Sequence, residues 1–297
     1  QHALAYALLE KFPTEDVAGE TLEQVREMLE QLKQSQQQIE SLLSNLESTI
    51  DQIEDPATKK KCQPLLTELR AELNINTLDR MATYQRLASD PSLAGQQKLA
   101  LAFSGWLLGS ENSDPNLMIA LSLVQVRALV YQYLNEPVKL ERDKLLEQFG
   151  GLEGASVATI SKLIAHMKPP LETPAPSPGA PGFYRLQVPV GIDREPDVSF
   201  CVQLPPQYDP HVRYPTIVTL NGAGTTPENQ VDWWAGERDA KGVRQGQATR
   251  FGYIVIAVDW LKEGQKEYEC SAREHAAVLA SLRDACRRFS IDTDRVF

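Results

Sequence analysis

The sequence predicts two domains, an all-α helical domain followed by an open α/β sheet, and three observations support this prediction. Up to about residue 167, apolar residues recur at the steps of three and four that place them on one face of a helix. Residues 168–182, KPPLETPAPSPGAPG, are rich in proline and small residues, which is typical of extended linkers. Beyond them, short β-branched segments replace the helical repeat. We therefore predict a helical domain at 1–168, a linker at 169–182 that forms no core, and an α/β domain at 183–297.

The helical domain is predicted to begin with one long helix. Between residues 22 and 53, apolar side chains repeat at steps of three and four, which forms an a/d seam. Pro56 is expected to end this helix, because proline disfavours helical geometry in the residue before it. The seam has two candidate partners: a second copy of the chain in a coiled coil, or the Leu66, Leu69 and Leu73 face of the next helix. That immediate helical neighbour favours an antiparallel hairpin within one chain.

Shorter helices are predicted along the rest of the first domain. The segment at 114–136 is the most apolar and is therefore expected at the centre of the domain. A helix before it is expected to stop at Gly109 in a left-handed cap, since glycine adopts that conformation without steric cost. The remaining segments lie at about 64–87, where one or two helices fit, at 138–149 and at 156–167.

Four strands and two helices follow the linker, and a fifth strand begins at the end of the chain. Residues 183–190 and 198–205 alternate in polarity, so we expect an antiparallel pair. Residues 215–220 and 252–260 are continuously apolar, as strands of a parallel sheet covered on both faces are. The predicted order is β-β-β-α-β-α-β, an open twisted α/β sheet. In such sheets, ligands bind at the carboxyl ends of the strands.

The two predicted helices of this domain differ in how clearly they are marked. The first has room between residues 226 and 241, but its limits are not defined by the sequence. The second begins with a capping box formed by Ser271 and Glu274. Val278, Leu282 and Phe289 are expected on its buried face, with Ala285 or Cys286 between the last two.

Composition excludes several classes of protein. The 297 residues carry a formal net charge of −10, and 42% of them are hydrophobic. A nucleic-acid-binding protein needs a basic face, and so does adsorption to anionic membranes, so neither is expected. No run of about 18 apolar residues predicts a transmembrane helix, and the protein is expected to be soluble. The first residues show no signal peptide and no initiator Met, so we expect the natural N-terminus upstream and leave the compartment open.

Cysteine and histidine do not suggest a metal site. The four cysteines are far apart and form no C-x-x-C motif, and no histidine stands at ligand spacing. We expect four buried or inactive thiols, no metal and no other cofactor. Each of the four histidines is interpreted as solvated or hydrogen-bonded; they are His2, His166, His211 and His275.

The turn Gly222-Ala223-Gly224 follows the third predicted strand and has three candidate roles. A phosphate cradle would need a third glycine or a Gly-Lys-Ser/Thr ending, and both are missing. Small residues can also simply allow a tight turn after a buried strand. The third role is an oxyanion hole, in which backbone N–H groups stabilise the negative charge that develops on a carbonyl oxygen during acyl transfer. The position after the third strand fits this role.

Residues 183–297 resemble the first half of an α/β-hydrolase domain, in particular that of esterases and prolyl-oligopeptidase-like serine hydrolases. The matching segments are FCVQLPPQYDPHVRYPTIVTLNGAG, GYIVIAVDW and AREHAAVLASLRDACRRFSIDTDRVF. In this family the third strand ends in His-Gly-x-Gly or a similar motif. The present chain has Asn221 where histidine is usual and keeps both glycines. The resemblance covers a little over a third of the chain.

The resemblance implies a truncated α/β-hydrolase-like sheet from a serine hydrolase that cleaves ester or peptide bonds. It places the nucleophile, in Gly-x-Ser-x-Gly, just after Phe297 and the acid and histidine later, so this chain would hold no catalytic residue and be inactive alone. The oxyanion hole would use Gly222, Ala223 and Gly224. The expected substrate-pocket residues are Asn221, Trp233, Trp234 and Asp259, where the tryptophans are equally compatible with core positions and Asp259 with a loop-shaping role.

A rival hypothesis assigns no chemistry to the chain. Long seams rich in Gln and Glu are typical of helices that bind partners, and the helical domain has no candidate chemistry. The chain would then be a non-catalytic interaction module fused to an α/β domain. As part of a hydrolase the helical domain would cap the active site, whereas as an interaction module it would bind a protein partner or a second copy through residues 22–53.

Overall fold

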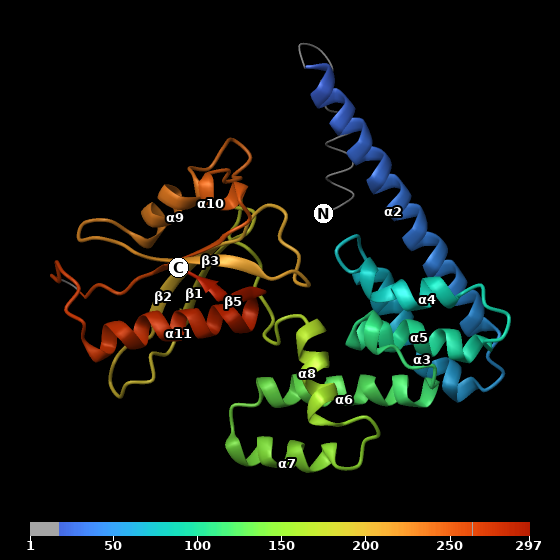
Figure 1. Ribbon diagram of the computed structural model, residues 1–297. Coiled ribbons are helices and arrows are strands. Elements are labelled where there is room, and N and C mark those ends of the chain that lie inside the picture. Colours follow the sequence, from blue (N-terminus) through green and yellow to red (C-terminus); the bar gives the residue numbers. More distant parts are fainter. Residues whose placement is uncertain (1–17, 263) are drawn as a thin grey trace. The chain divides into compact units, whose positions relative to one another are not determined.

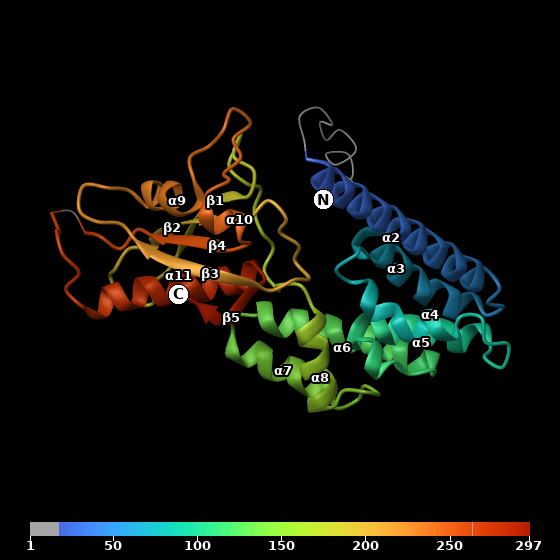
Figure 2. The same ribbon diagram turned by 45° about the horizontal axis from the view of Figure 1, so that its top comes forward.

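The chain forms two compact units, and the boundary between them in the sequence lies between Met167 and Lys168. We describe a computed structural model, which covers residues 18–262 and 264–297. The first unit is helical, and the second contains a mixed five-stranded sheet with helices (Figures 1 and 2). Each unit has its own hydrophobic core. The predicted architecture of a helical region followed by an α/β region is confirmed at this level.

The helical unit begins with a hairpin. Helix α2 (Gly19–Asp51) is followed by α3 (Pro56–Glu72), which packs against it. Leu46 and Ile50 of α2 share a core with the buried Leu66 and Leu69 of α3. The hairpin interpretation is therefore confirmed for the second half of α2.

The start of α3 differs from the prediction, which placed it near residue 64. The Asp55 side chain accepts a hydrogen bond from the N–H of Thr58 at 2.9 Å, and Pro56 occupies the first helical position. Proline is favoured there because its missing N–H would have no partner in any case. Pro64 lies inside the helix, where it removes one hydrogen bond without ending it.

The remaining elements of this unit pack around α5, except α7, which packs against α6. They are η1 (Leu78–Met81), α4 (Ala82–Leu87), α5 (Gly95–Leu108), η2 (Ser110–Asn112), α6 (Leu117–Asn135), α7 (Lys139–Phe149) and α8 (Val157–His166). Every residue from Leu99 to Leu108 is buried, whereas only six residues of α6 are. The prediction that the 114–136 helix lies at the centre was wrong. Small side chains explain the difference, since a Cβ added at Gly105 would lie 2.6 Å from the carbonyl oxygen of Arg80.

Two further features of these helices bear on the predictions. Gly109 ends α5 with φ +86°, as expected of glycine, but its ψ of 152° lies outside the left-handed helical region, so the predicted cap type was wrong. Helix α6 is long and apolar enough to cross a bilayer, the only such helix among the described residues. It packs against α5, α7 and α8 within the helical unit.

The α/β unit has the sheet order β1-β2-β4-β3-β5. The strands are β1 (Phe183–Val188), β2 (Val198–Gln203), β3 (Tyr214–Leu220), β4 (Ile254–Val258) and β5 (Ile291–Val296). β2 pairs antiparallel with both β1 and β4, and β3 pairs parallel with both β4 and β5. The predicted antiparallel pair, the parallel crossovers and the element order are confirmed, with one added short helix, α10 (Gln247–Arg250).

Helices cover both faces of this sheet. Along β4, Ile254, Ile256 and Val258 share a core with α11 (Ala272–Arg288), whereas Val255 and Ala257 share a core with α9 (Pro227–Ala235). Successive side chains of a strand point to opposite faces, so α9 and α11 lie on opposite sides, as Figures 1 and 2 show. The capping box of Ser271 and Glu274 is confirmed.

Two local predictions for this unit need correction. On the buried face of α11, Leu282, Ala285 and the following Phe289 take part in the core as predicted, but Val278 does not and is half-buried. Ala277 takes its place, because the helix packs closely enough on the sheet to favour a small residue there. The 169–182 segment is not a free linker. The N–H of Leu171 donates to Arg287 O at 2.8 Å, and Ala180 belongs to the core beneath α9.

Candidate functional site

The candidate site lies at the carboxyl ends of β3 and β4. Because these strands are parallel neighbours, the segments that follow them leave the same edge of the sheet. The chain after β3 enters α9 on one face, and the chain after β4 enters α11 on the other. Adjacent strands whose connections leave toward opposite faces open a crevice at that edge, where ligands bind in α/β sheets.

The Gly222–Thr225 segment forms a closed turn at this edge. The N–H of Thr225 donates to Gly222 O at 3.1 Å, and the Thr225 hydroxyl donates to the same oxygen at 2.8 Å. Gly224 has φ +81°, which is required at the third position of a type II turn. Residues 222–225 are exposed. No described residue accepts a hydrogen bond from the N–H of Ala223 or Gly224, so both donors remain available to an anion.

Asn221 closes this turn from below. Its side chain is 3% exposed, and its Nδ2 donates to Thr225 O at 2.8 Å. Its own carbonyl oxygen accepts a hydrogen bond from Trp260 Nε1 at 3.0 Å. Asn221 Oδ1 is buried without a partner in the described part of the chain. An asparagine side chain supplies here both the donor that closes the turn and a further acceptor.

Trp260 was not singled out in the sequence, although it lies at the centre of this site. It follows β4, is 4% exposed, and packs its ring against Tyr268 with centroids 5.0 Å apart. Arg273 of α11 donates from Nη1 to Trp260 O at 2.8 Å and from Nε to Glu195 at 3.0 Å. The GYIVIAVDW segment contains this residue, but no sequence pattern shows that its indole reaches the β3 turn.

Glu274 organises the segment between β4 and α11. It is 1% exposed, and its carboxylate accepts hydrogen bonds from Gln265 Nε2, Glu269 N–H and Ser271 N–H at 2.5, 2.9 and 2.6 Å. Burial raises the pKa of this carboxyl, but the hydrogen bonds outweigh it and lower the pKa from 4.5 to about 2. The capping box predicted only the bond to Ser271.

The Glu274 carboxylate is expected to make the α/β unit sensitive to acid. Its folded-state pKa of about 2 lies below the ordinary 4.5, so its stabilisation is complete above 4.5 and is lost as pH falls toward 2. In Glu274→Gln, the urea midpoint of the α/β unit should fall at neutral pH and depend less on pH in the acid range. Glu237→Gln, at an exposed carboxylate, serves as the control. Parallel pH profiles for wild type and Glu274→Gln would contradict this role.

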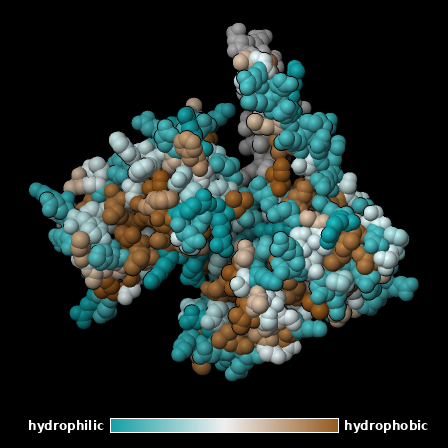
Figure 3. Space-filling model, in the orientation of Figure 1, coloured by the Kyte–Doolittle hydropathy of each residue, from teal (hydrophilic) through white to brown (hydrophobic). Residues whose placement is uncertain are grey.

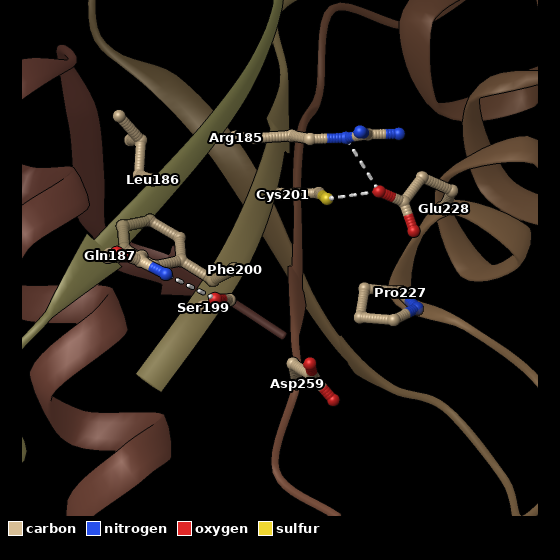
Figure 4. Close-up of a pocket in the computed structure, with 9 residues that line it drawn as sticks. All are labelled: Arg185, Leu186, Gln187, Ser199, Phe200, Cys201, Pro227, Glu228 and Asp259. Carbon is tan, nitrogen blue, oxygen red and sulfur yellow. Dashed lines mark hydrogen bonds and ion pairs between the residues drawn. The ribbon is translucent and has the colours of Figure 1, made fainter. Parts of the chain in front are cut away.

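Asp259 lies near the edge but faces a polar groove beside β1 and β2. Its N–H donates to Ser199 O at 2.9 Å, which ties the end of β4 to β2. Burial, and then the charge of Glu228, raise the pKa of the Asp259 carboxyl, and Arg273 opposes them. The groove has a volume of about 500 Å³ and is lined by Arg185, Leu186, Gln187, Ser199, Phe200, Cys201, Pro227, Glu228 and Asp259 (Figure 4).

Within this groove, Glu228 is the centre of a small polar cluster. Arg185 Nε lies 2.8 Å from Glu228 Oε1, and Cys201 Sγ donates to the same oxygen at 3.4 Å, while Asp259 stands apart (Figure 4). Burial and then the Glu228 charge raise the pKa of the Cys201 thiol to about 12. A thiol with that pKa stays protonated at neutral pH and is not a nucleophile.

The two tryptophans proposed for the pocket have different surroundings. Trp233 is 80% exposed, so it is not a core residue, and it does not line the groove of Figure 4. Trp234 donates from Nε1 to Thr219 Oγ1 at 3.3 Å and lines an apolar groove of about 450 Å³ with Phe251, Phe297 and other residues. Figure 3 shows hydrophobic surface gathered where β3 and β5 lie in Figure 1. Neither groove includes a residue of the Gly222–Thr225 turn.

The histidines have structural contacts. His166 Nδ1 donates a hydrogen bond to Lys162 O at 2.9 Å, and burial lowers the pKa of the ring. The backbone N–H of His211 donates to Asp209, and the His275 ring lies 6.0 Å from that of Tyr268. His2 lies outside the described residues. Across 18–262 and 264–297, no three His, Cys, Asp or Glu side chains converge as metal ligands would.

Comparison with known proteins adds no relative. No model of a known protein family matches the chain, and no curated protein matches it. The geometry of the β3 edge and the sequence resemblance are therefore the observations that bear on function.

Proposed function

We propose that residues 183–297 are the first half of the catalytic domain of a serine hydrolase that cleaves ester or peptide bonds. The observation that carries this proposal is the Gly222–Thr225 turn, which leaves the N–H groups of Ala223 and Gly224 without partners among the described residues, at the carboxyl edge of a doubly covered sheet. Backbone donors fixed in this way need no rearrangement when charge develops in front of them.

In the proposed reaction, a serine oxygen attacks the substrate carbonyl carbon while a histidine takes the serine proton. The carbonyl oxygen becomes an oxyanion, which accepts a hydrogen bond from the N–H of Ala223 or Gly224. Collapse of this intermediate expels the alcohol or amine, which receives the proton, and leaves an acyl-serine. Water then attacks the acyl carbon while the histidine takes a proton from it. The second intermediate expels the serine oxygen, which receives that proton, and the carboxylic acid is released. No cofactor takes part.

The neighbouring strand supports this arrangement. β5 runs parallel to β3, and the N–H of Val218 donates to Phe297 O at 2.8 Å. Parallel neighbours lead toward the same edge of a sheet, so residues that continue β5 would approach the Gly222–Thr225 turn. By the resemblance to α/β-hydrolases, we expect the nucleophile elbow there, with its serine close to the N–H groups of the turn.

A fluorophosphonate probe tests this function on the full-length gene product. We expect one labelled serine, in a Gly-x-Ser-x-Gly sequence shortly after Phe297, identified by mass spectrometry of the labelled peptide. Chain 1–297 alone, treated in parallel, should remain unlabelled. Labelling of a serine within residues 1–297, or no labelling of the full-length protein, would contradict the proposal.

A second proposed function concerns the first half of α2, and one observation favours it. Leu22, Val25, Leu29 and Leu32 continue the apolar seam but do not belong to the core that the second half of α2 shares with α3. They are half-buried, and Met28 beside them is 50% exposed. Because the seam keeps a/d spacing, we propose that a second copy of the chain packs on it as a coiled coil.

Sedimentation of chain 1–297 tests this self-association. We expect a concentration-dependent dimer that Leu29→Glu abolishes, because a carboxylate would lie in the apolar seam. Gln31→Glu adds the same charge at an exposed position of α2 and should leave the dimer intact. A wild-type chain that sediments as a monomer at every protein concentration measured would rule out the dimer.

A further inference from the structure

The Trp260 side chain makes a hydrogen bond that joins the ends of two strands. Its indole N–H donates to the carbonyl oxygen of Asn221 at 3.0 Å, across 39 positions of the sequence. Both residues are buried, with 4% and 3% exposure. A buried hydrogen bond of this kind has no competition from solvent, so it holds the two loops in one relative position.

We infer that the Trp260–Asn221 hydrogen bond is a latch that positions the oxyanion turn, with Trp260 and Asn221 as positioning residues. The inference depends on the proposed hydrolase function for its catalytic consequence, but the latch itself does not. The carbonyl group that Trp260 holds belongs to the peptide unit that enters Gly222. The Asn221 side chain holds the Thr225 carbonyl at the other end of the turn.

The latch fixes both ends of the turn and leaves its middle free. Gly222 O is occupied by the Thr225 N–H and hydroxyl, Thr225 O by Asn221 Nδ2, and Asn221 O by Trp260. Among the described residues, the N–H groups of Ala223 and Gly224 then have no acceptor, and the buried Asn221 Oδ1 has no donor. An oxyanion hole depends on this kind of prior orientation, since donors that must first rearrange stabilise the transition state less.

Trp260 can serve as a latch because it is itself held from other directions. Arg273 binds its carbonyl oxygen and is paired through Nε with Glu195, which also binds Lys262 at 3.0 Å. Tyr268 packs on its ring at a centroid distance of 5.0 Å. These contacts come from α11, the β1–β2 connection and the segment after β4. The indole position is therefore set independently of the β3 turn.

Amide hydrogen exchange in chain 1–297 tests the latch without any activity. In Trp260→Phe the ring is kept and the N–H donor is lost. We expect the Thr225 amide to exchange about tenfold faster or more, with β4 amides unchanged. Trp106→Phe is the matched control, since it removes another buried indole hydrogen bond, to Glu68 in the helical unit. An unchanged Thr225 exchange rate in Trp260→Phe would overturn the inference.

Kinetics of the full-length gene product test the positioning role. Trp260→Phe should lower kcat about tenfold or more with KM nearly unchanged, whereas Trp106→Phe should leave both constants at the wild-type values. If Trp260→Phe does not fold, Asn221→Ala breaks the other bond of the latch and replaces it in both experiments. Faster Thr225 exchange with unchanged kcat would overturn the positioning role. A wild-type protein without hydrolase activity would instead refute the proposed function, and the exchange result would still decide the latch.

Discussion

Ala223→Pro is expected to lower the kcat of the full-length hydrolase by about 10²–10³-fold, the usual effect of removing one oxyanion donor. Proline has no N–H, so the substitution deletes the donor at position 223. The turn itself should survive, because Ala223 occupies the second position of a type II turn, where proline is favoured. Gly222 before it accommodates the restriction that proline places on its predecessor.

The control for this substitution is Ala223→Ser, which keeps the backbone N–H at the same exposed position. It should retain most of the wild-type kcat. Thermal unfolding of both variants should match that of the wild type, since no Ala223 contact belongs to the core. A proline variant with full kcat and normal stability would exclude Ala223 as the donor and leave Gly224 as the candidate in this turn.

Gly246→Ala is expected to destabilise the α/β unit by about 3 kcal/mol, at the upper end of the usual cost of overpacking. A Cβ at this position would lie 2.3 Å from Gly236 N and 2.4 Å from Ala235 C. Both atoms belong to the backbone at the end of α9, so no side chain can move aside. The shift would also disturb the hydrogen bond from Gly246 N–H to Ala235 O, which is 2.6 Å long.

Gly222→Ala is the matched control for stability, because a Cβ there would meet no atom within 4 Å. Urea unfolding, followed by a probe in the α/β unit, should separate the two variants clearly. Equal midpoints for Gly246→Ala and wild type would show that the close approach of residues 236 and 246 does not constrain the fold.

Much of the architecture could be predicted from local patterns. Continuous apolar runs identified β3 and β4 as strands covered on both faces, and alternation identified the β1–β2 pair. The Ser271–Glu274 capping box marked the start of α11. These features are local in sequence, and each depends on a period or a cap that a few residues define. The turn at Gly222 was found for the same reason.

Other features could not be predicted, because they depend on contacts between distant residues. The burial of α5 rather than α6 follows from close packing at Gly105, which the higher hydrophobicity of α6 does not reveal. The Trp260 indole meets Asn221 only because β3 and β4 are neighbours in the sheet. Trp233 was grouped with Trp234 on sequence grounds, yet it is mostly exposed, because adjacent helical residues point in different directions.

We propose that the Gly222–Thr225 turn donates a backbone hydrogen bond to the oxyanion of a serine hydrolase. A crystal structure of the full-length protein, phosphonylated on its active serine, tests it most directly, because the phosphonyl oxygen stands in for the oxyanion. We expect the N–H nitrogen of Ala223 or Gly224 about 2.7–3.1 Å from that oxygen. A phosphonyl oxygen bound only by donors from outside residues 222–224 would contradict it.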